Sequence, residues 1–167
     1  FLAGWEINLF FEKKLASPKL KIKIKDAGAN PEKDNLAEFL TLEAARAVWR
    51  AIDFCKKKKL SEIPSEALLY FSLEEWARAD FVFLRALLDI KEIKKELWLY
   101  LESQKGEKFS EKLSDDSQKV ILTALKITQK NNRERITPGD IVTCQSRIDP
   151  TFKKYLVLAN LSPEDIE

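Results

Sequence analysis

The chain carries the same pattern twice, at a constant separation of 73 residues. Residues 36–60 read LAEFLTLEAARAVWRAIDFCKKKKL, and residues 109–133 read FSEKLSDDSQKVILTALKITQKNNR. Few identities remain, but the physical class is kept in the pairs Leu40 and Leu113, Thr41 and Ser114, Val48 and Ile121, Ala51 and Ala124, Ile52 and Leu125, and Ile63 and Ile136. A duplicated unit of about seventy residues indicates stacked helical repeats that bury their apolar faces against each other.

Helix start signals recur in both units. Thr41 is a good N-cap, and an apolar stripe follows it as far as Cys55. Later starts in the first unit are predicted at Ser65, Asp80 and Ile90, with Ser65 as a cap for a helix from Glu66 to about Phe71 and the Ile90 helix ending near Gln104. In the second unit the predicted starts are Ser114, Thr137-Pro138-Gly139-Asp140, Asp149-Pro150 and Ser162-Pro163.

These signals predict an all-α fold. We expect two pseudo-symmetric four-helix repeats, residues 36–104 and 109–167, packed as one eight-helix domain. The last helix is cut after one turn at Glu167, and the chain has no methionine at its start or elsewhere. We therefore expect the sequence to be a piece of a longer product.

Residues 1–35 differ from the repeats. The stretch FLAGWEINLFFEKKL is dense in large apolar side chains, and Leu20, Ile22 and Ile24 then alternate with lysines, which predicts a short strand-like arm. Residues 26–35 read as a linker. Two interpretations stay open: contact with a membrane surface, or an arm that packs on the helical body. The apolar stretch is too short to span a bilayer.

Composition argues against chemistry in this chain. No histidine is present, which excludes imidazole acid–base catalysis, His-based triads and most zinc sites. The four glycines never form a phosphate-binding loop, and no GxxxxGK[ST] motif occurs. The net charge of +2 gives no general reason to expect a nucleic acid partner. We expect no catalytic residue, no metal site, no cofactor and no enzymatic activity.

The two cysteines indicate the redox state of the compartment in which the protein works. Cys55 and Cys144 both fall inside predicted apolar helices, so each is expected to be a small buried hydrophobic residue. Nothing in their spacing indicates a disulfide framework. We therefore expect a reducing, cytoplasmic location, with membrane association through the N-terminal segment left open.

The repeats resemble a known family. The segments FLTLEAARAVWRAIDFCKKKKLSEIPSEALLYF, FLRALLDIKEIKKEL, FSEKLSDDSQKVILTALKITQKNNRERITPGDIV and YLVLANLSPEDI are similar to the Clp N-terminal repeat. That repeat occurs in tandem at the front of Clp-family AAA+ unfoldases and their disaggregase relatives. The resemblance covers residues 36–167. In two respects it departs from the family: Ser65-Glu66 and Pro138-Gly139 stand where the repeat usually has a histidine, and residues 1–35 have no counterpart.

The resemblance implies a docking role. In such unfoldases the doubled domain binds substrate proteins or adaptors, while a downstream AAA+ ring hydrolyses ATP. It carries no catalytic residue over to this chain. Two helical units leave a groove at their junction, and an exposed apolar groove is a common peptide site. The predicted contact residues are Trp76, Tyr70, Phe71, Glu74 and Glu75.

Structural roles compete with ligand contact for several of these residues. Tyr70, Phe71 and Phe81 suit the core, whereas Trp76, within the polar stretch LEEWARAD, is the aromatic residue expected to be exposed. Acids and lysines near helix ends are expected without any function, and this covers Lys56–Lys59 at the end of the first helix. The alternative function is a histone-fold-like DNA-binding or dimerisation protein, suggested by the ITPGDI turn.

Overall fold

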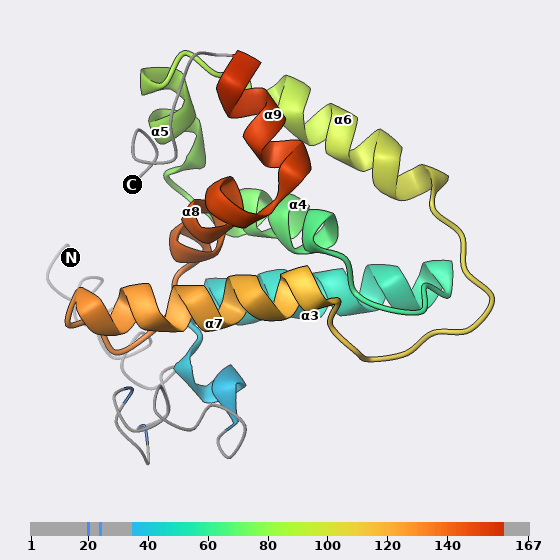
Figure 1. Ribbon diagram of the computed structural model, residues 1–167, viewed down its shortest axis with the longest axis horizontal. Coiled ribbons are helices and arrows are strands. Elements are labelled where there is room, and N and C mark those ends of the chain that lie inside the picture. Colours follow the sequence, from blue (N-terminus) through green and yellow to red (C-terminus); the bar gives the residue numbers. More distant parts are fainter. Residues whose placement is uncertain (1–19, 21–23, 25–34, 159–167) are drawn as a thin grey trace, which may run out of the picture.

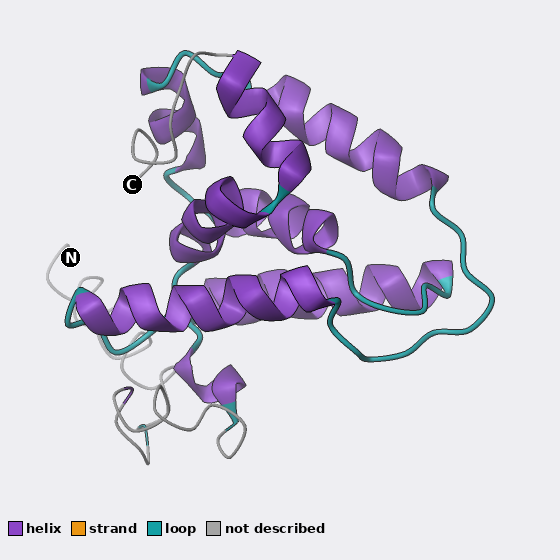
Figure 2. Cartoon of the chain, in the orientation of Figure 1, coloured by secondary structure: helices purple, strands orange, loops and turns teal. Residues whose placement is uncertain are grey.

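The computed structural model describes Leu20, Ile24 and residues 35–158 of the chain (Figures 1 and 2). Within them lie one 3₁₀ helix and seven α-helices, while named strands are absent from this described part. The elements are η1 (Leu36–Phe39), α3 (Leu42–Lys58), α4 (Ser65–Glu75), α5 (Ala79–Arg85), α6 (Ile90–Ser103), α7 (Asp115–Lys130), α8 (Pro138–Ile148) and α9 (Pro150–Leu158). The all-α fold class is confirmed.

The predicted caps at Thr41, Ser114 and Thr137 are confirmed. The Thr41 hydroxyl accepts a hydrogen bond from Ala44 N at 3.3 Å, and the Ser114 hydroxyl accepts one from Ser117 N at 3.2 Å. Thr137 and Asp140 form a reciprocal capping box at the start of α8. Each cap satisfies a backbone N–H that has no partner inside its own helix.

The prediction for Ser65 is wrong. Helix α4 already includes Ser65, and its N-cap is Pro64, which makes no side-chain capping bond. The Ser65 hydroxyl instead donates to Asp149 Oδ2 at 2.6 Å, in a buried contact that joins α4 to the start of α9. Asp149 also accepts from Phe152 N at 2.9 Å, as a cap for α9 should. Helix α4 then runs on to Glu75 rather than ending near Phe71.

The two repeats are joined by reciprocal backbone pairs. Leu40 forms a parallel bridge with Ile136, and Ile63 forms one with Leu113. A shift of 73 residues converts each bridge into the other. The hydrogen bonds follow the same rule, because Thr41 N donates to Ile136 O at 2.9 Å and Ser114 N donates to Ile63 O at 3.0 Å. The chain therefore has internal pseudo-twofold symmetry.

The symmetry argues against the histone-fold alternative. That fold needs a long central helix with shorter helices on either side, whereas α3 and α7 are separate helices of 17 and 16 residues. Each of them opens its own repeat after an equivalent cap. The ITPGDI segment forms the turn that leads into α8 and supplies Ile136 to the bridge with the other repeat.

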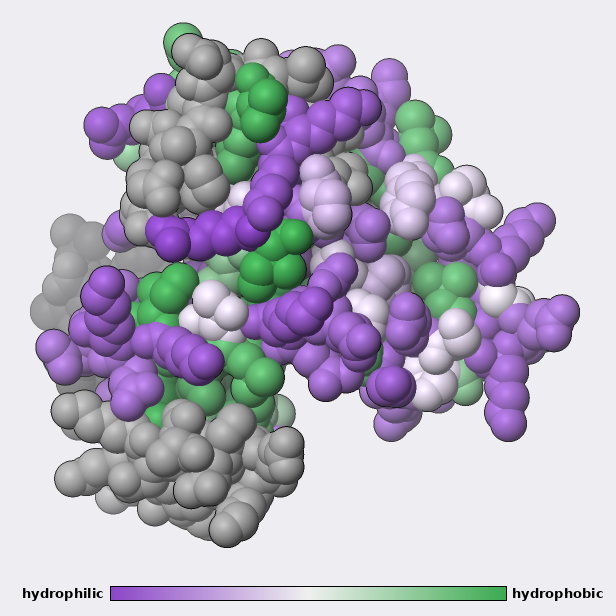
Figure 3. Space-filling model, viewed as in Figure 1, coloured by the Kyte–Doolittle hydropathy of each residue, from purple (hydrophilic) through white to green (hydrophobic). Residues whose placement is uncertain are grey.

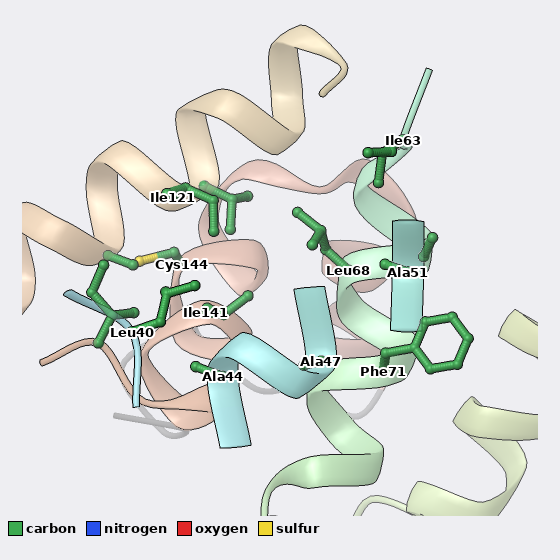
Figure 4. Close-up of a cluster of buried hydrophobic side chains, with 14 of the residues drawn as sticks. Leu40, Ala44, Ala47, Ala51, Ile63, Leu68, Phe71, Ile121, Ile141 and Cys144 are labelled. Carbon is green, nitrogen blue, oxygen red and sulfur yellow. The ribbon is translucent and has the colours of Figure 1, made fainter. Parts of the chain in front are cut away.

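Small residues allow the central helices to pack closely (Figure 4). Ala44, Ala47 and Ala51 line the inner face of α3 and are fully buried. Helix α3 packs on α4 and α8, and the main core includes Leu68 of α4 and Ile141 of α8. The cysteines are confirmed as buried hydrophobic residues: both lie in this core, and burial raises the pKa of the Cys55 thiol to about 11.

A second apolar cluster lies where α4, α5, α6, α8 and α9 meet. Phe83 and Phe152 stack there with ring centroids 6.0 Å apart, and both are fully buried. The prediction that Phe81 belongs to the core is wrong. Helix α5 buries Ala79 and Phe83, so Phe81 points outward and is 61% exposed.

Most of residues 1–35 falls outside the described residues, as does the eighth helix predicted from Ser162. Of the predicted arm, Leu20 and Ile24 are described: Leu20 packs partly buried on the main core, and Ile24 is buried in it. The backbone at Ile24 is helical. Among the described residues, no helix combines the length and the apolarity that a membrane crossing requires.

Candidate functional site

A groove of about 390 Å³ lies between α3 and α6, within the first repeat and not at the junction of the two repeats where a groove was expected. Its apolar lining consists of Trp49 and Phe54 from α3, Phe71 from α4 and Trp98 from α6. Phe54 and Phe71 are buried, while Trp49 is 64% exposed and Trp98 is 37% exposed. The border of the groove is therefore formed by two exposed indole rings, and its floor by two phenyl rings that are largely buried.

The aromatic rings hold one another in place. Trp98 lies 5.5 Å from Phe54 and 5.2 Å from Tyr70, measured between ring centroids. Tyr70 meets Phe71 edge-on at 5.1 Å, and Phe54 lies 6.0 Å from Phe71. Tilted and edge-on contacts at these distances are favourable. Trp98 is thus half exposed on a supported aromatic base, which reduces the entropy that it would lose on contacting a ligand.

Ion pairs border the same groove. Glu75 receives two guanidinium groups at 2.9 Å, those of Arg46 and Arg50, and its own side chain is only 6% exposed. Arg50 also lies over the Phe71 ring at 5.1 Å. Farther along α3, Lys57 pairs with Asp53 at 2.7 Å.

At the carboxyl end of α3, Lys58 reaches across the groove. Its ammonium group lies 2.8 Å from Glu102 Oε2 and 5.9 Å from the centre of the Phe54 ring. This contact ties α3 to α6 directly. The groove therefore has an apolar floor, two exposed indoles and a border on which acids and bases alternate.

The structure brings some of the predicted contact residues to this groove. Phe71 lines it, and Tyr70 supports Trp98 from behind. Glu75 anchors the two arginines, and Glu74 forms an ion pair with Lys94 at 2.8 Å. Both acids therefore have structural partners. A direct contact of either acid with a ligand stays a prediction.

Trp76 lies elsewhere. It caps the end of α4, is half-buried, and meets Phe83 edge-on at 6.4 Å. A Cβ atom added to Gly139 would come within 2.9 Å of the indole, so the ring packs directly on the start of α8. The expectation that Trp76 is exposed is wrong, because the turn after α4 folds its side chain against the second repeat. Its role in binding stays a prediction.

Sequence reasoning missed Trp49 and Trp98. Both stand on helices among charged residues: Trp49 lies between Arg46 and Arg50, and Trp98 follows Lys94 and Lys95. A large apolar side chain on the charged side of an amphipathic helix is the signal that could have found them. On the face shown in Figure 3, hydrophilic side chains cover most of the described surface, and hydrophobic ones emerge in separate areas.

A second exposed apolar area surrounds α5. Phe81, Leu84 and Leu87 are 61%, 73% and 91% exposed. A shallow hollow of about 590 Å³ lies beside Leu84 and Leu87 and extends to the start of α6. Leu87 has a φ of 56°, which is unusual for a residue with a branched side chain. In the described part of the chain, no three His, Cys, Asp or Glu side chains gather closely enough to hold a metal ion.

Comparisons with known proteins identify the fold. No family model and no curated protein sequence matches this chain. Among solved structures, the Hsp104 N-terminal domain from Candida albicans superposes with a TM-score of 0.62 at 16% identity, covering 76% of this chain and 85% of that one. The N-terminal domain of the ClpV1 ATPase from the E. coli EAEC Sci1 T6SS gives a TM-score of 0.63 at 19% identity, covering 78% and 83%.

A third solved structure is a ClpV N-domain in complex with a VipB peptide. It has a TM-score of 0.63 at 14% identity, and the match covers 89% of each chain. At these identities the likeness concerns the fold. The chain therefore has the fold of the Clp N-terminal domain found in AAA+ unfoldases.

Proposed function

We propose that this chain is the substrate- or adaptor-binding domain of a Clp-type ATP-dependent unfoldase, and that the groove between α3 and α6 holds the bound polypeptide. The chemistry would belong to an AAA+ ring elsewhere in the full-length protein. The observation that carries the proposal is the pair of exposed indoles, Trp49 and Trp98, above the buried Phe54 and Phe71. A solved ClpV N-domain with a bound VipB peptide supports the same role for this fold.

Exposed aromatic side chains are unfavourable in water. Trp49 and Trp98 leave apolar surface in water, and binding a partner would remove that surface from water. Tryptophan is also the residue type most often found at energetic centres of protein interfaces. The border of ion pairs would surround such a centre with polar groups that tolerate water when the groove is empty.

The experiment compares two sets of substitutions. We expect Trp49→Ala together with Trp98→Ala to weaken binding of a labelled unfolded protein by about tenfold or more, as for the loss of two interface anchors. The matched control is Leu122→Ala, because Leu122 occupies the position of Trp49 in the second repeat. That change should alter the dissociation constant by less than about twofold.

Fluorescence anisotropy measures the dissociation constants, and circular dichroism verifies that each variant keeps its helical content. If the double variant remains folded and binds as tightly as the parent, the groove does not hold the polypeptide. If neither the parent nor any variant binds unfolded protein, the docking function itself is wrong.

A further inference from the structure

We propose that the groove between α3 and α6 selects a polypeptide segment in which acidic residues flank a large apolar side chain. This inference rests on the proposed function and specifies its ligand. The apolar side chain would lie between Trp49 and Trp98, above Phe54. The acidic residues would meet cations of α3 and α6 that the described acids do not fully pair.

Each carboxylate at the groove forms an ion pair with a cation of the fold. Asp53 pairs with Lys57, Glu102 with Lys58, and Glu74 with Lys94. Glu75 carries one negative charge but forms ion pairs with two guanidinium groups, those of Arg46 and Arg50. The ion pairs therefore leave one positive charge uncompensated beside the groove, where the side chain of Glu75 is shielded from water.

Two lysines add to this excess. Lys56 follows Trp49 by seven residues and Lys95 precedes Trp98 by three, so each lies on the same side of its helix as the neighbouring indole. Both lysines are exposed, and within residues 35–158 neither has an acidic partner. Each exposed indole is thus accompanied by a cation that no acid of this described range neutralises, which is the arrangement that an apolar side chain between acids would complement.

The same charges argue against a nucleic acid ligand. Aromatic rings with nearby cations also suit single-stranded nucleic acid. Here, however, the carboxylates of Asp53 and Glu102 line the groove itself. A continuous phosphate backbone would pass close to both acids, whereas a peptide can place its few acidic side chains beside the lysines and its neutral backbone beside the carboxylates.

The test uses three labelled peptides of equal length with the same leucine–phenylalanine centre. Their flanking residues are glutamate, glutamine or lysine. We expect the glutamate peptide to bind about fivefold more tightly than the glutamine peptide at about 50 mM salt, and this preference to shrink at about 300 mM salt because exposed charges are screened. The lysine peptide should bind most weakly.

Charge-reversal substitutions then test whether Lys56 and Lys95 cause the preference for the glutamate peptide. Lys56→Glu with Lys95→Glu should weaken binding of the glutamate peptide by about three- to tenfold and leave the glutamine peptide within about twofold. The control is Lys126→Glu with Lys130→Glu on α7, which changes the net charge equally at exposed positions away from the groove. That control should leave all three affinities within about twofold.

Each outcome decides between the two proposals. If the glutamate and glutamine peptides bind equally, and the Trp49 and Trp98 substitutions abolish both, the docking function stands and the acidic preference is wrong. The preference is also wrong if the α7 control has the same effect as the groove variant, or if an oligothymidine strand binds more tightly than every peptide. If no peptide and no unfolded protein binds, the docking function falls and takes the inference with it.

Discussion

The two repeats differ most where they do not touch each other. The contacts between them are equivalent, since the Leu40–Ile136 and Ile63–Leu113 bridges exchange under the 73-residue shift. Their outer surfaces are not equivalent. In α7, Leu122, Thr123 and Ile127 stand at the positions that Trp49, Arg50 and Phe54 occupy in α3. The backbone plan is therefore shared by both repeats, while the aromatic groove belongs to the first alone.

This difference separates the requirements of folding from those of binding. A position that contacts the other repeat must keep its size and polarity, because protein interiors are close-packed. A position on the outer face of a helix is free of that constraint, and the exposed Trp49 there fits the ligand contact proposed above. Substitutions at equivalent positions in the two repeats can break or sharpen this comparison.

The largest effect is expected for the paired core residues Leu68 and Ile141, which are fully buried and lie 73 residues apart (Figure 4). Replacing either by alanine should lower the free energy of unfolding by about 2–5 kcal/mol. Chemical denaturation followed by circular dichroism measures this change. Because both residues lie in one core, each variant should unfold in a single transition. Two separate transitions would show that the repeats fold independently, against the architecture described above.

A smaller effect should distinguish Ser65 from Ser114. Ser114→Ala removes a helix cap and should cost about 1 kcal/mol. Ser65→Ala removes the hydroxyl that donates to the buried Asp149 and should cost about 1–3 kcal/mol, because a buried carboxylate loses a hydrogen bond. The midpoints of urea denaturation compare the two variants, with Ser110→Ala at an exposed position as the control. A loss at Ser65 no larger than that of the Ser110→Ala control would mean that the contact with Asp149 adds no stability.

The smallest effect concerns the pH dependence of stability. Desolvation, reinforced by the nearby carboxylate of Asp149, raises the pKa of Glu66 above its usual range. Ionisation of Glu66 is therefore less favourable in the folded state than in the unfolded state. Its contribution is most favourable at low pH and declines as the pH rises from its unfolded pKa through its folded pKa.

Glu66→Gln removes this titration. We expect the variant to be slightly more stable than the parent at pH 7, with a difference that narrows below about pH 4, where Glu66 is protonated in both states. Thermal unfolding across this pH range measures the difference. Glu62→Gln, at an exposed position four residues away, is the control. A parent that is more stable at pH 7 than the variant with glutamine at this position would contradict the assigned direction.

The helix starts followed from local interactions and could be predicted. Thr41, Ser114 and Thr137 each bond to a backbone N–H three residues later, so sequence neighbours are enough to identify them. The duplication was also visible, because apolar and capping positions repeat at one spacing. Ser65 lay beyond the same reasoning, since its partner Asp149 is 84 residues away.

The groove also depends on contacts between residues that are far apart in the sequence. Trp49 and Trp98 belong to different helices, and they border one groove only because α3 and α6 both pack on α4. Trp76, which the polar residues around it made look exposed, is turned inward by the nearness of Gly139 in the other repeat. The sequence by itself thus determined the helices, their caps and the duplicated repeat, because these depend on interactions between residues that are close in the chain. Packing between distant segments decided which aromatic rings face water, because burial depends on every element that surrounds a side chain.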